Sequence, residues 1–96
     1  MSSDPWAIVD TPYCQRALKR FLKKHPDLRR TYDDIIHLLA ADPHEPSLRL
    51  HPLGGTHAGE HAVSVTYSYR MILTIVVIEH HIVLLDIGSH DDVYRQ

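Results

Sequence analysis

The chain has 96 residues, of which 44% are hydrophobic and 23% charged, as expected for one soluble globular domain with a modest core. Its net charge of −2 excludes a strongly basic domain that would bind nucleic acid by charge alone, so RNA binding would need a local site. A single cysteine, Cys14, excludes an intrachain disulfide, and no apolar run is long enough to span a bilayer.

The first third of the chain predicts a strand and two helices. Residues 5–10 are typical of a short strand, and Thr11 before a proline predicts a helix N-cap. Apolar residues at helical spacing continue this helix to residue 24, because Pro26 disfavours helical geometry at the residue before it. Its opposite face is basic and carries Arg16, Lys19, Arg20, Lys23 and Lys24. A second apolar stripe predicts another helix up to the turn-rich stretch 42–46, which gives a helical hairpin.

The remainder of the chain is rich in β-forming residues. Runs at 61–67, 70–78 and 82–87 are typical of strands, and the middle run is apolar on both faces, which indicates a central strand. Short links between the runs favour antiparallel hairpins, and the histidine pair at 80–81 is expected in the tight turn between the last two. The tail from 88 to 94 predicts a strand exit followed by one turn of helix.

These elements predict an α+β fold in the order β-α-α-β-β-β, which forms a single domain over residues 1–96. The helical hairpin packs on one face of a small antiparallel sheet, and the other sheet face is left for a site. Residues 47–53 lead from the second helix into a glycine-containing loop at 54–59.

Four strings of the sequence occur in an informative order. They are Asp-Pro at 42–43 with Leu-His-Pro-Leu-Gly-Gly at 50–55, Val-Ser-Val-Thr-Tyr-Ser-Tyr-Arg at 63–70, Leu-Leu-Asp-Ile-Gly-Ser-His at 84–90, and Asp-Asp-Val-Tyr at 91–94. With the order of elements, they resemble the RelE/ParE toxin superfamily, particularly the ribonuclease branch that includes RelE and YafQ. The resemblance covers about residues 6–94. Each string alone is weak, and the ordered set is what makes it specific.

The resemblance implies a toxin that cleaves mRNA without a metal ion or cofactor. The 2′-hydroxyl of the RNA would attack the adjacent phosphorus, a reaction that requires a base, an acid and a cation at the phosphate. By resemblance, His90 is the expected acid and Arg70 the phosphate-binding cation. His51 would act as base or phosphate donor, and Tyr94 would stack on a nucleobase or orient phosphate.

Each of these residues also has a structural alternative. His90 could hydrogen-bond the tail, and Arg70 could form a salt bridge with Asp86 or another acid of the sheet. His51 could pack against the helix exit, and Tyr94 could anchor the tail to the sheet.

The sequence departs from the family pattern at several positions. Ser64 and Ser68 stand where one branch has a histidine and an acid, and residues 56–61 contain no lysine where other branches have lysines. His57 or His61 could therefore replace His51 as the base, and the choice stays open. The expected RNA contacts beyond the catalytic group are Arg49, His57, His61, Ser64 and Ser68. Weak positive charge implies weak binding of free RNA, which favours a toxin that meets mRNA on the ribosome.

The resemblance also implies partners and a compartment. An antitoxin would wrap the toxin and cover its site, and operator DNA would be bound only through that antitoxin. The basic helix face would contact ribosomal RNA or an acidic antitoxin segment, or would simply be solvated. The opening residues lack the features of a signal peptide, so a cytoplasmic protein without a membrane segment is expected.

Two other functions fit the same fold, and metal binding does not fit well. A ParE-like protein would inhibit DNA gyrase without nuclease chemistry, and a non-catalytic domain would only bind an antitoxin. His57 and His61 are four residues apart but straddle a loop and a strand start, and the chain has neither a Cys pair nor an H-E-x-x-H motif. No metal site is expected.

Overall fold

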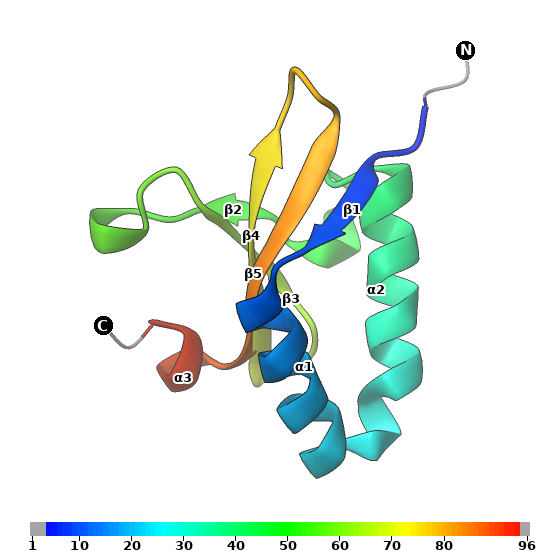
Figure 1. The fold of residues 1–96 in the computed structure, drawn as a ribbon, viewed down its shortest axis with the longest axis vertical. Helices are drawn as coiled ribbons and strands as arrows, with labels where there is room; N and C mark the ends of the chain where they lie inside the picture. Colours follow the sequence, from blue (N-terminus) through cyan, green and yellow to red (C-terminus); the bar gives the residue numbers. More distant parts are fainter. Residues whose placement is uncertain (1–3, 95–96) are drawn as a thin grey trace.

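A computed structural model describes residues 4–94, which form a five-stranded sheet in the order β1-β5-β4-β3-β2, with helices on both faces (Figure 1). The strands are β1 (Ala7–Asp10), β2 (His51–Pro52), β3 (His61–Ser64), β4 (Tyr69–Val76) and β5 (His81–Ser89). The helices are α1 (Pro12–Lys24), α2 (Arg29–Ala41) and α3 (His90–Tyr94), and 3-10 turns lie at Pro26–Leu28, Pro46–Leu48 and Gly55–His57.

The two long helices follow the sequence prediction closely. The Thr11 hydroxyl accepts a hydrogen bond from the backbone N–H of Cys14, which caps the start of α1, and donates to the carbonyl of Leu84 in β5 at 2.8 Å. Helix α1 ends at Lys24, as Pro26 predicts, and the five basic residues of its outer face are all exposed. The second helix begins slightly later than its apolar stripe suggests, because a 3-10 turn at Pro26–Leu28 precedes it.

The sheet confirms the antiparallel order of β3, β4 and β5 and differs from the prediction in its edges. Strand β1 pairs parallel with β5, with Ala7 opposite His81, so the sheet is mixed. Strand β2 adds a short edge beside β3 where only a lead into the loop was expected. Strand β3 ends at Ser64, because the chain turns at residues 65–68 and the N–H of Val65 already bonds the carbonyl of Tyr69. His81 belongs to β5, and only His80 of that pair lies in the turn.

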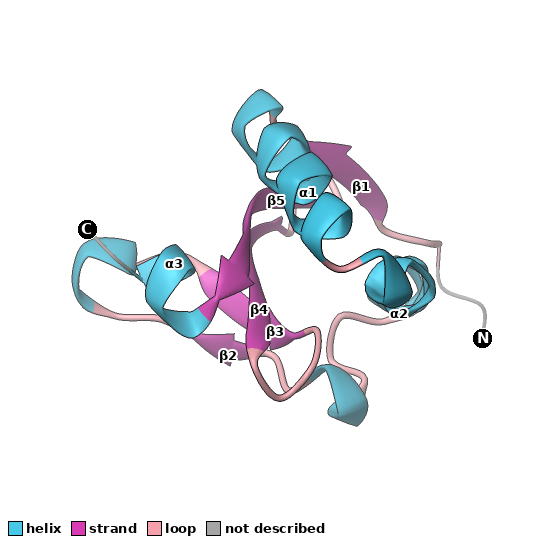
Figure 2. Ribbon diagram, turned by 90° about the horizontal axis from the view of Figure 1, so that it is seen from below, coloured by secondary structure: helices cyan, strands magenta, loops and turns pink. Residues whose placement is uncertain are grey.

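Figure 2 shows α1 and α2 on one side of the sheet and α3 on the other, and a hydrophobic core lies on each of the two sheet faces. The large core lies between the helical hairpin and the sheet and includes Phe21, Leu39, Met71 and Leu84. The small core is formed by Ala62, Ile72 and Val93, with Leu53, Leu85 and Tyr94 packed against it. Helix α3 therefore covers part of the face that the sequence left open, and any site on that face lies around this helix.

Candidate functional site

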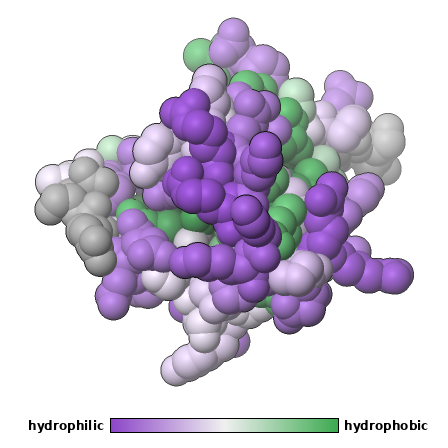
Figure 3. All heavy atoms as spheres, turned by 60° about the horizontal axis from the view of Figure 1, so that its bottom comes forward, coloured by the Kyte–Doolittle hydropathy of each residue, from purple (hydrophilic) through white to green (hydrophobic). Residues whose placement is uncertain are grey.

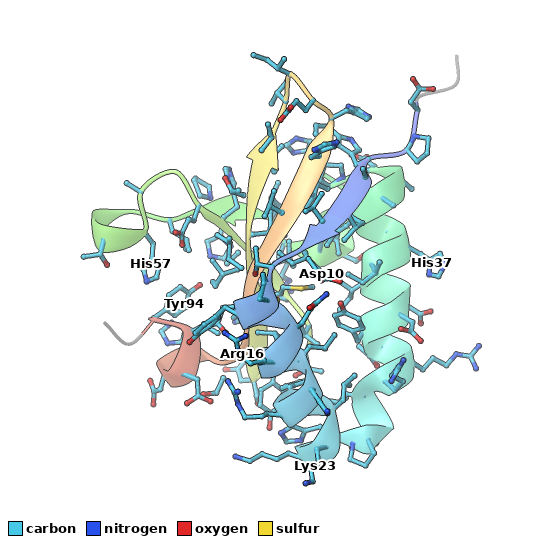
Figure 4. The ribbon with its side chains drawn as sticks, in the orientation of Figure 1. Asp10, Arg16, Lys23, His37, His57 and Tyr94 are labelled. Atoms are coloured by element: carbon cyan, nitrogen blue, oxygen red, sulfur yellow. The ribbon has the colours of Figure 1, made fainter. Side chains whose placement is uncertain are left out.

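Three aromatic rings gather beside α3, two of them imidazoles. The ring of Tyr94 meets that of His90 edge-on at a centroid distance of 4.4 Å and that of His57 at 6.0 Å. Figure 4 shows His57 and Tyr94 facing each other on the side of the molecule where α3 lies. We call this group the His57–Tyr94–His90 cluster. Tyr94 also packs against the small core, so it anchors the tail as well as lying in the site.

A carboxylate orients one imidazole of the cluster. Nδ1 of His57 lies 2.8 Å from Oε1 of Glu60, and the His57 side chain is only 16% exposed. An ionised carboxylate only accepts, so Nδ1 carries the hydrogen and a neutral ring keeps its lone pair on Nε2. This Nε2 is buried and has no hydrogen-bond partner within residues 4–94. The spacing of His57 and Glu60 in the loop could have suggested this pair from the sequence.

The other imidazole of the cluster is open to solvent. The His90 side chain is 69% exposed, and its Nδ1 lies 4.0 Å from the carboxylate of Asp91, at the limit of an ion pair. His90 begins α3 directly after β5 ends. The His90 ring can therefore contact a ligand without any rearrangement of the protein.

The strand register brings Arg70 to the same end of the sheet as His90. Arg70 pairs with Gly88 across the β4–β5 ladder, and a side chain built on Gly88 would contact Asp92 and Val93 of α3. Paired residues of adjacent strands share a face, so Arg70 leaves the sheet on the side that α3 covers. Its Nη1 donates to the carbonyls of the β3–β4 turn, at residues 66, 67 and 69. No carboxylate of residues 4–94 forms an ion pair with it, so the alternative of a salt bridge to Asp86 is wrong.

The remaining predicted residues divide between the two faces. His51 pairs with Ala62 and Ser64 with Arg70, so both lie on the α3 face. His61 pairs with Leu73 of the large core, which places it on the opposite face and away from the cluster. Arg49 and Ser68 are exposed, in the loop before β2 and in the β3–β4 turn.

An acidic residue that the sequence reading did not assign to the site also lies here. Asp86 of β5 is half-buried, and desolvation raises the pKa of its carboxyl; the backbone N–H of Ile87, Arg20 and His57 oppose that rise, and Asp92 adds to it. Its Oδ1 accepts a hydrogen bond from the N–H of Ile87 at 2.8 Å. The sequence indicates Asp86 only as an alternative salt-bridge partner of Arg70, because no local pattern shows which groups face a strand residue.

A cleft of about 500 Å³ opens between α1 and the end of β5. Its lining includes Tyr13, Arg20, Lys24, Tyr69, Asp86 and Asp92. Hydrophilic side chains dominate the face of the molecule in Figure 3, with apolar side chains visible between them. Because Ser89 and Asp92 also line the cleft, it adjoins His90 along the chain.

Residues 4–94 contain neither a metal-binding cluster nor a helix that could span a membrane. No three His, Cys, Asp or Glu side chains in this part of the chain gather closely enough to hold a metal ion. None of its helices combines the length and apolar character needed to cross a bilayer.

Comparison with solved structures identifies the fold. YafQ from Escherichia coli strain BL21(DE3) superposes with a TM-score of 0.79 at 16% identity, over 93% of this chain and 98% of that chain. A YoeB/ParE toxin from Agrobacterium tumefaciens superposes with a TM-score of 0.75 at 15% identity, over 88% and 98% of the two chains. This chain has the RelE/ParE toxin fold. The E. coli DinJ–YafQ toxin–antitoxin complex also matches, with a TM-score of 0.77 at 17% identity, over 94% and 98% of the chains.

Comparisons of sequence do not extend this structural result. No family model matches the chain, and no curated protein matches it either. The RelE/ParE fold is therefore recognised from backbone architecture, and the side chains of the site decide which chemistry it can support.

Proposed function

We propose that this chain is the toxin of a type II toxin–antitoxin system and that it cleaves mRNA on the ribosome through attack by the RNA's own 2′-hydroxyl. The observation that carries the proposal is the His57–Tyr94–His90 cluster, which lies on the same sheet face as Arg70. The RelE/ParE fold supports it, because structural neighbours with this fold are described as a toxin and as a toxin–antitoxin complex. The proposal places the protein in the cytoplasm, where ribosomes and mRNA are.

The residues divide the reaction between them. The exposed His90 protonates the 5′-oxygen that leaves, because its ring is the one imidazole of the cluster that is open to solvent. The guanidinium nitrogens of Arg70 other than Nη1 hold the phosphate as charge builds on its oxygens. Tyr94 stacks on a nucleobase beside the scissile bond.

Either His51 or His57 takes the proton from the 2′-hydroxyl. His51 is exposed on β2, and its Nδ1 contacts the carbonyl of Arg49 at 3.0 Å. His57 is better oriented, because its Nδ1 contacts Glu60, but its Nε2 is buried. The substrate would have to displace the side chains that bury this atom. Glutamine variants of the two residues, compared in one cleavage assay, identify the base.

The partner of the toxin is an antitoxin that covers this face. The DinJ–YafQ complex supports this, because a chain of the same fold is bound there by an antitoxin. The net charge of −2 gives little general affinity for RNA, so the ribosome is proposed to position the mRNA. Operator DNA is then bound only through the antitoxin.

The test compares His90→Gln with wild type in purified ribosomes programmed with a defined mRNA. Wild type should cut the mRNA and leave 5′-hydroxyl ends, and the variant should be slower by about 10²–10⁴-fold. His37→Gln is the matched control, because His37 is exposed on α2 and points away from the cluster in Figure 4. Both variants should unfold at the wild-type urea concentration.

Three outcomes would contradict the proposal in different ways. Intact mRNA during toxic expression would exclude the nuclease. Inhibition of purified gyrase in a supercoiling assay would instead point to a ParE-like inhibitor. Harmless accumulation of folded protein would point to a domain that only binds an antitoxin.

A further inference from the structure

The cleft beside α1 lies at a free edge of the sheet. Strand β1 ends at Asp10, opposite Leu84, so residues 85–89 of β5 have β4 on one side and no strand on the other. The Thr11 hydroxyl caps the carbonyl of Leu84, and the Asp86 carboxylate caps the N–H of Ile87. Because side chains already bond these backbone groups, the ligands of this edge are selected by side-chain contacts and not by pairing with a further strand.

Charges of both signs face this cleft without pairing. Arg20 and Lys24 of α1 line it together with Asp86 of β5 and Asp92 of α3. None of the ion pairs formed within residues 4–94 joins these cations to these carboxylates. A ligand that carries an anion at one end and hydrogen-bond donors at the other would complement both groups at once.

Aromatic rings form another part of the cleft wall. Tyr69 contacts His25 at a centroid distance of 4.7 Å and Phe21 at 5.1 Å, and all three line the cleft. Tyr13 lines it as well and is 57% exposed. Flat aromatic rings next to cations are the usual binding surface for the bases and phosphates of single-stranded nucleic acid.

The Asp86 carboxylate selects among bases. It can only accept hydrogen bonds when ionised, and apart from the N–H of Ile87 it has no partner within residues 4–94. Guanine offers two adjacent donors, N1–H and the N2 amino group, to such a carboxylate. Uracil offers one donor flanked by two carbonyl oxygens, which a carboxylate repels.

We propose that this cleft is a nucleotide subsite that prefers guanine, with Asp86 accepting from the base, Arg20 and Lys24 at the phosphate, and Tyr69 or Tyr13 stacked on the ring. The inference rests on the proposed function, because it makes the subsite part of the RNA path that continues to His90. An adjoining subsite of this kind would set which nucleotide lies next to the cut.

The binding test uses guanosine and uridine 5′-monophosphate as probes and amide chemical shifts of the free protein as readout. Guanosine monophosphate should shift residues 86–89 and bind more tightly than uridine monophosphate. Asp86→Asn should lower the affinity for guanosine monophosphate by about tenfold, because the carboxylate–base pair is lost. The affinity for uridine monophosphate should not change. Arg20→Gln should weaken both probes alike, and Asp34→Asn, on the exposed surface of α2, should change neither.

The outcomes separate this inference from the nuclease. The subsite would be overturned by equal affinity for the two probes or by chemical-shift changes outside the cleft. It would also be overturned if Asp86→Asn bound guanosine monophosphate as tightly as wild type. Each of these results would count even if the protein cuts mRNA. If the protein leaves mRNA intact but binds guanosine monophosphate through Asp86, the proposed subsite is supported and the proposed nuclease activity is excluded. If both hold, sequencing of the cleavage ends should show a guanine preference that Asp86→Asn weakens and Asp34→Asn retains.

Discussion

Arg70 lies directly across the β4–β5 ladder from Gly88, the residue on which α3 packs. A Cβ atom at position 88 would lie 3.2 Å from the Cβ of Asp92 and 3.5 Å from Cγ1 of Val93. The missing side chain therefore allows α3 to approach the sheet, and this approach brings Tyr94 and His90 to the face from which Arg70 extends.

Replacing Gly88 with alanine tests this arrangement. The added methyl group should push α3 away by a few tenths of an ångström, which should lower the proposed mRNA cleavage by about tenfold because the proposed catalytic groups lose alignment. Gly54→Ala is the control, because a Cβ at Gly54 would meet nothing within 4 Å and its φ of −118° suits alanine. Equal cleavage by the two variants would show that the position of α3 does not matter to the reaction.

Arg70→Ala should destabilise the hairpin as well as remove the proposed phosphate ligand. The loss of the Nη1 hydrogen bonds to the turn carbonyls should lower the free energy of unfolding by about 1–3 kcal/mol. Arg70→Lys should retain the positive charge but not the planar guanidinium group. Its rate of cleavage should therefore stay below that of wild type, as in Arg70→Ala. Urea unfolding measures the first effect, with Arg29→Ala as control, because its exposed contact with Asp33 at 3.8 Å should contribute less than about 0.5 kcal/mol.

Cys14 should be unreactive in the folded protein. Burial, followed by the charges of Asp10 and Asp86, raises the pKa of its thiol to about 12. Since the thiolate is the reactive form, labelling with a disulfide reagent at pH 8 should be at least about a hundredfold slower than in denaturant. Similar rates in the two conditions would mean that the start of α1 opens easily in the native state.

Asp86 should make the protein less stable as the pH rises. Desolvation, the largest effect, raises its folded-state pKa above the usual 3.8, so the folded chain binds this proton more tightly than the unfolded chain. The free energy of unfolding therefore falls as the pH rises from about the ordinary pKa of the carboxyl through its folded-state pKa. At higher pH this contribution to stability does not return. Asp86→Asn removes this titration and should gain in stability, relative to wild type, between acidic and neutral pH.

Urea unfolding at a series of pH values measures this difference. The same series on Asp34→Asn should give a difference from wild type that hardly changes, because Asp34 is exposed. A constant difference for Asp86→Asn as well would mean that Asp86 is solvated in the folded protein.

The helical half of the molecule was the most predictable part, because its signals are local. Thr11 with the following proline marks the start of α1, and Pro26 explains its end. The core face of α1 also follows from spacing alone, since Cys14, Ala17 and Phe21 are all buried. No distant residue has to be known for any of these assignments.

The edges of the sheet and the setting of the site depend on non-local pairing. The parallel pairing of β1 with β5 joins residues more than seventy positions apart, and β2 is only two residues long. Whether His51 or His61 lies on the α3 face depends on strand register, which a slip of one residue would reverse. The free edge at Asp86 depends on where β1 stops, so no local pattern could reveal the cleft.

The hydrogen bond between Thr11 and Leu84 spans 73 positions, and it has a consequence for how the chain is made. Strand β1 and the beginning of α1 find their sheet neighbour only in β5, more than seventy residues later in the chain. A nascent polypeptide therefore cannot close this sheet until β5 has left the ribosome, and long-range closure of this kind slows folding. Because α3 follows β5 directly, the site around this helix can form only after that strand has emerged.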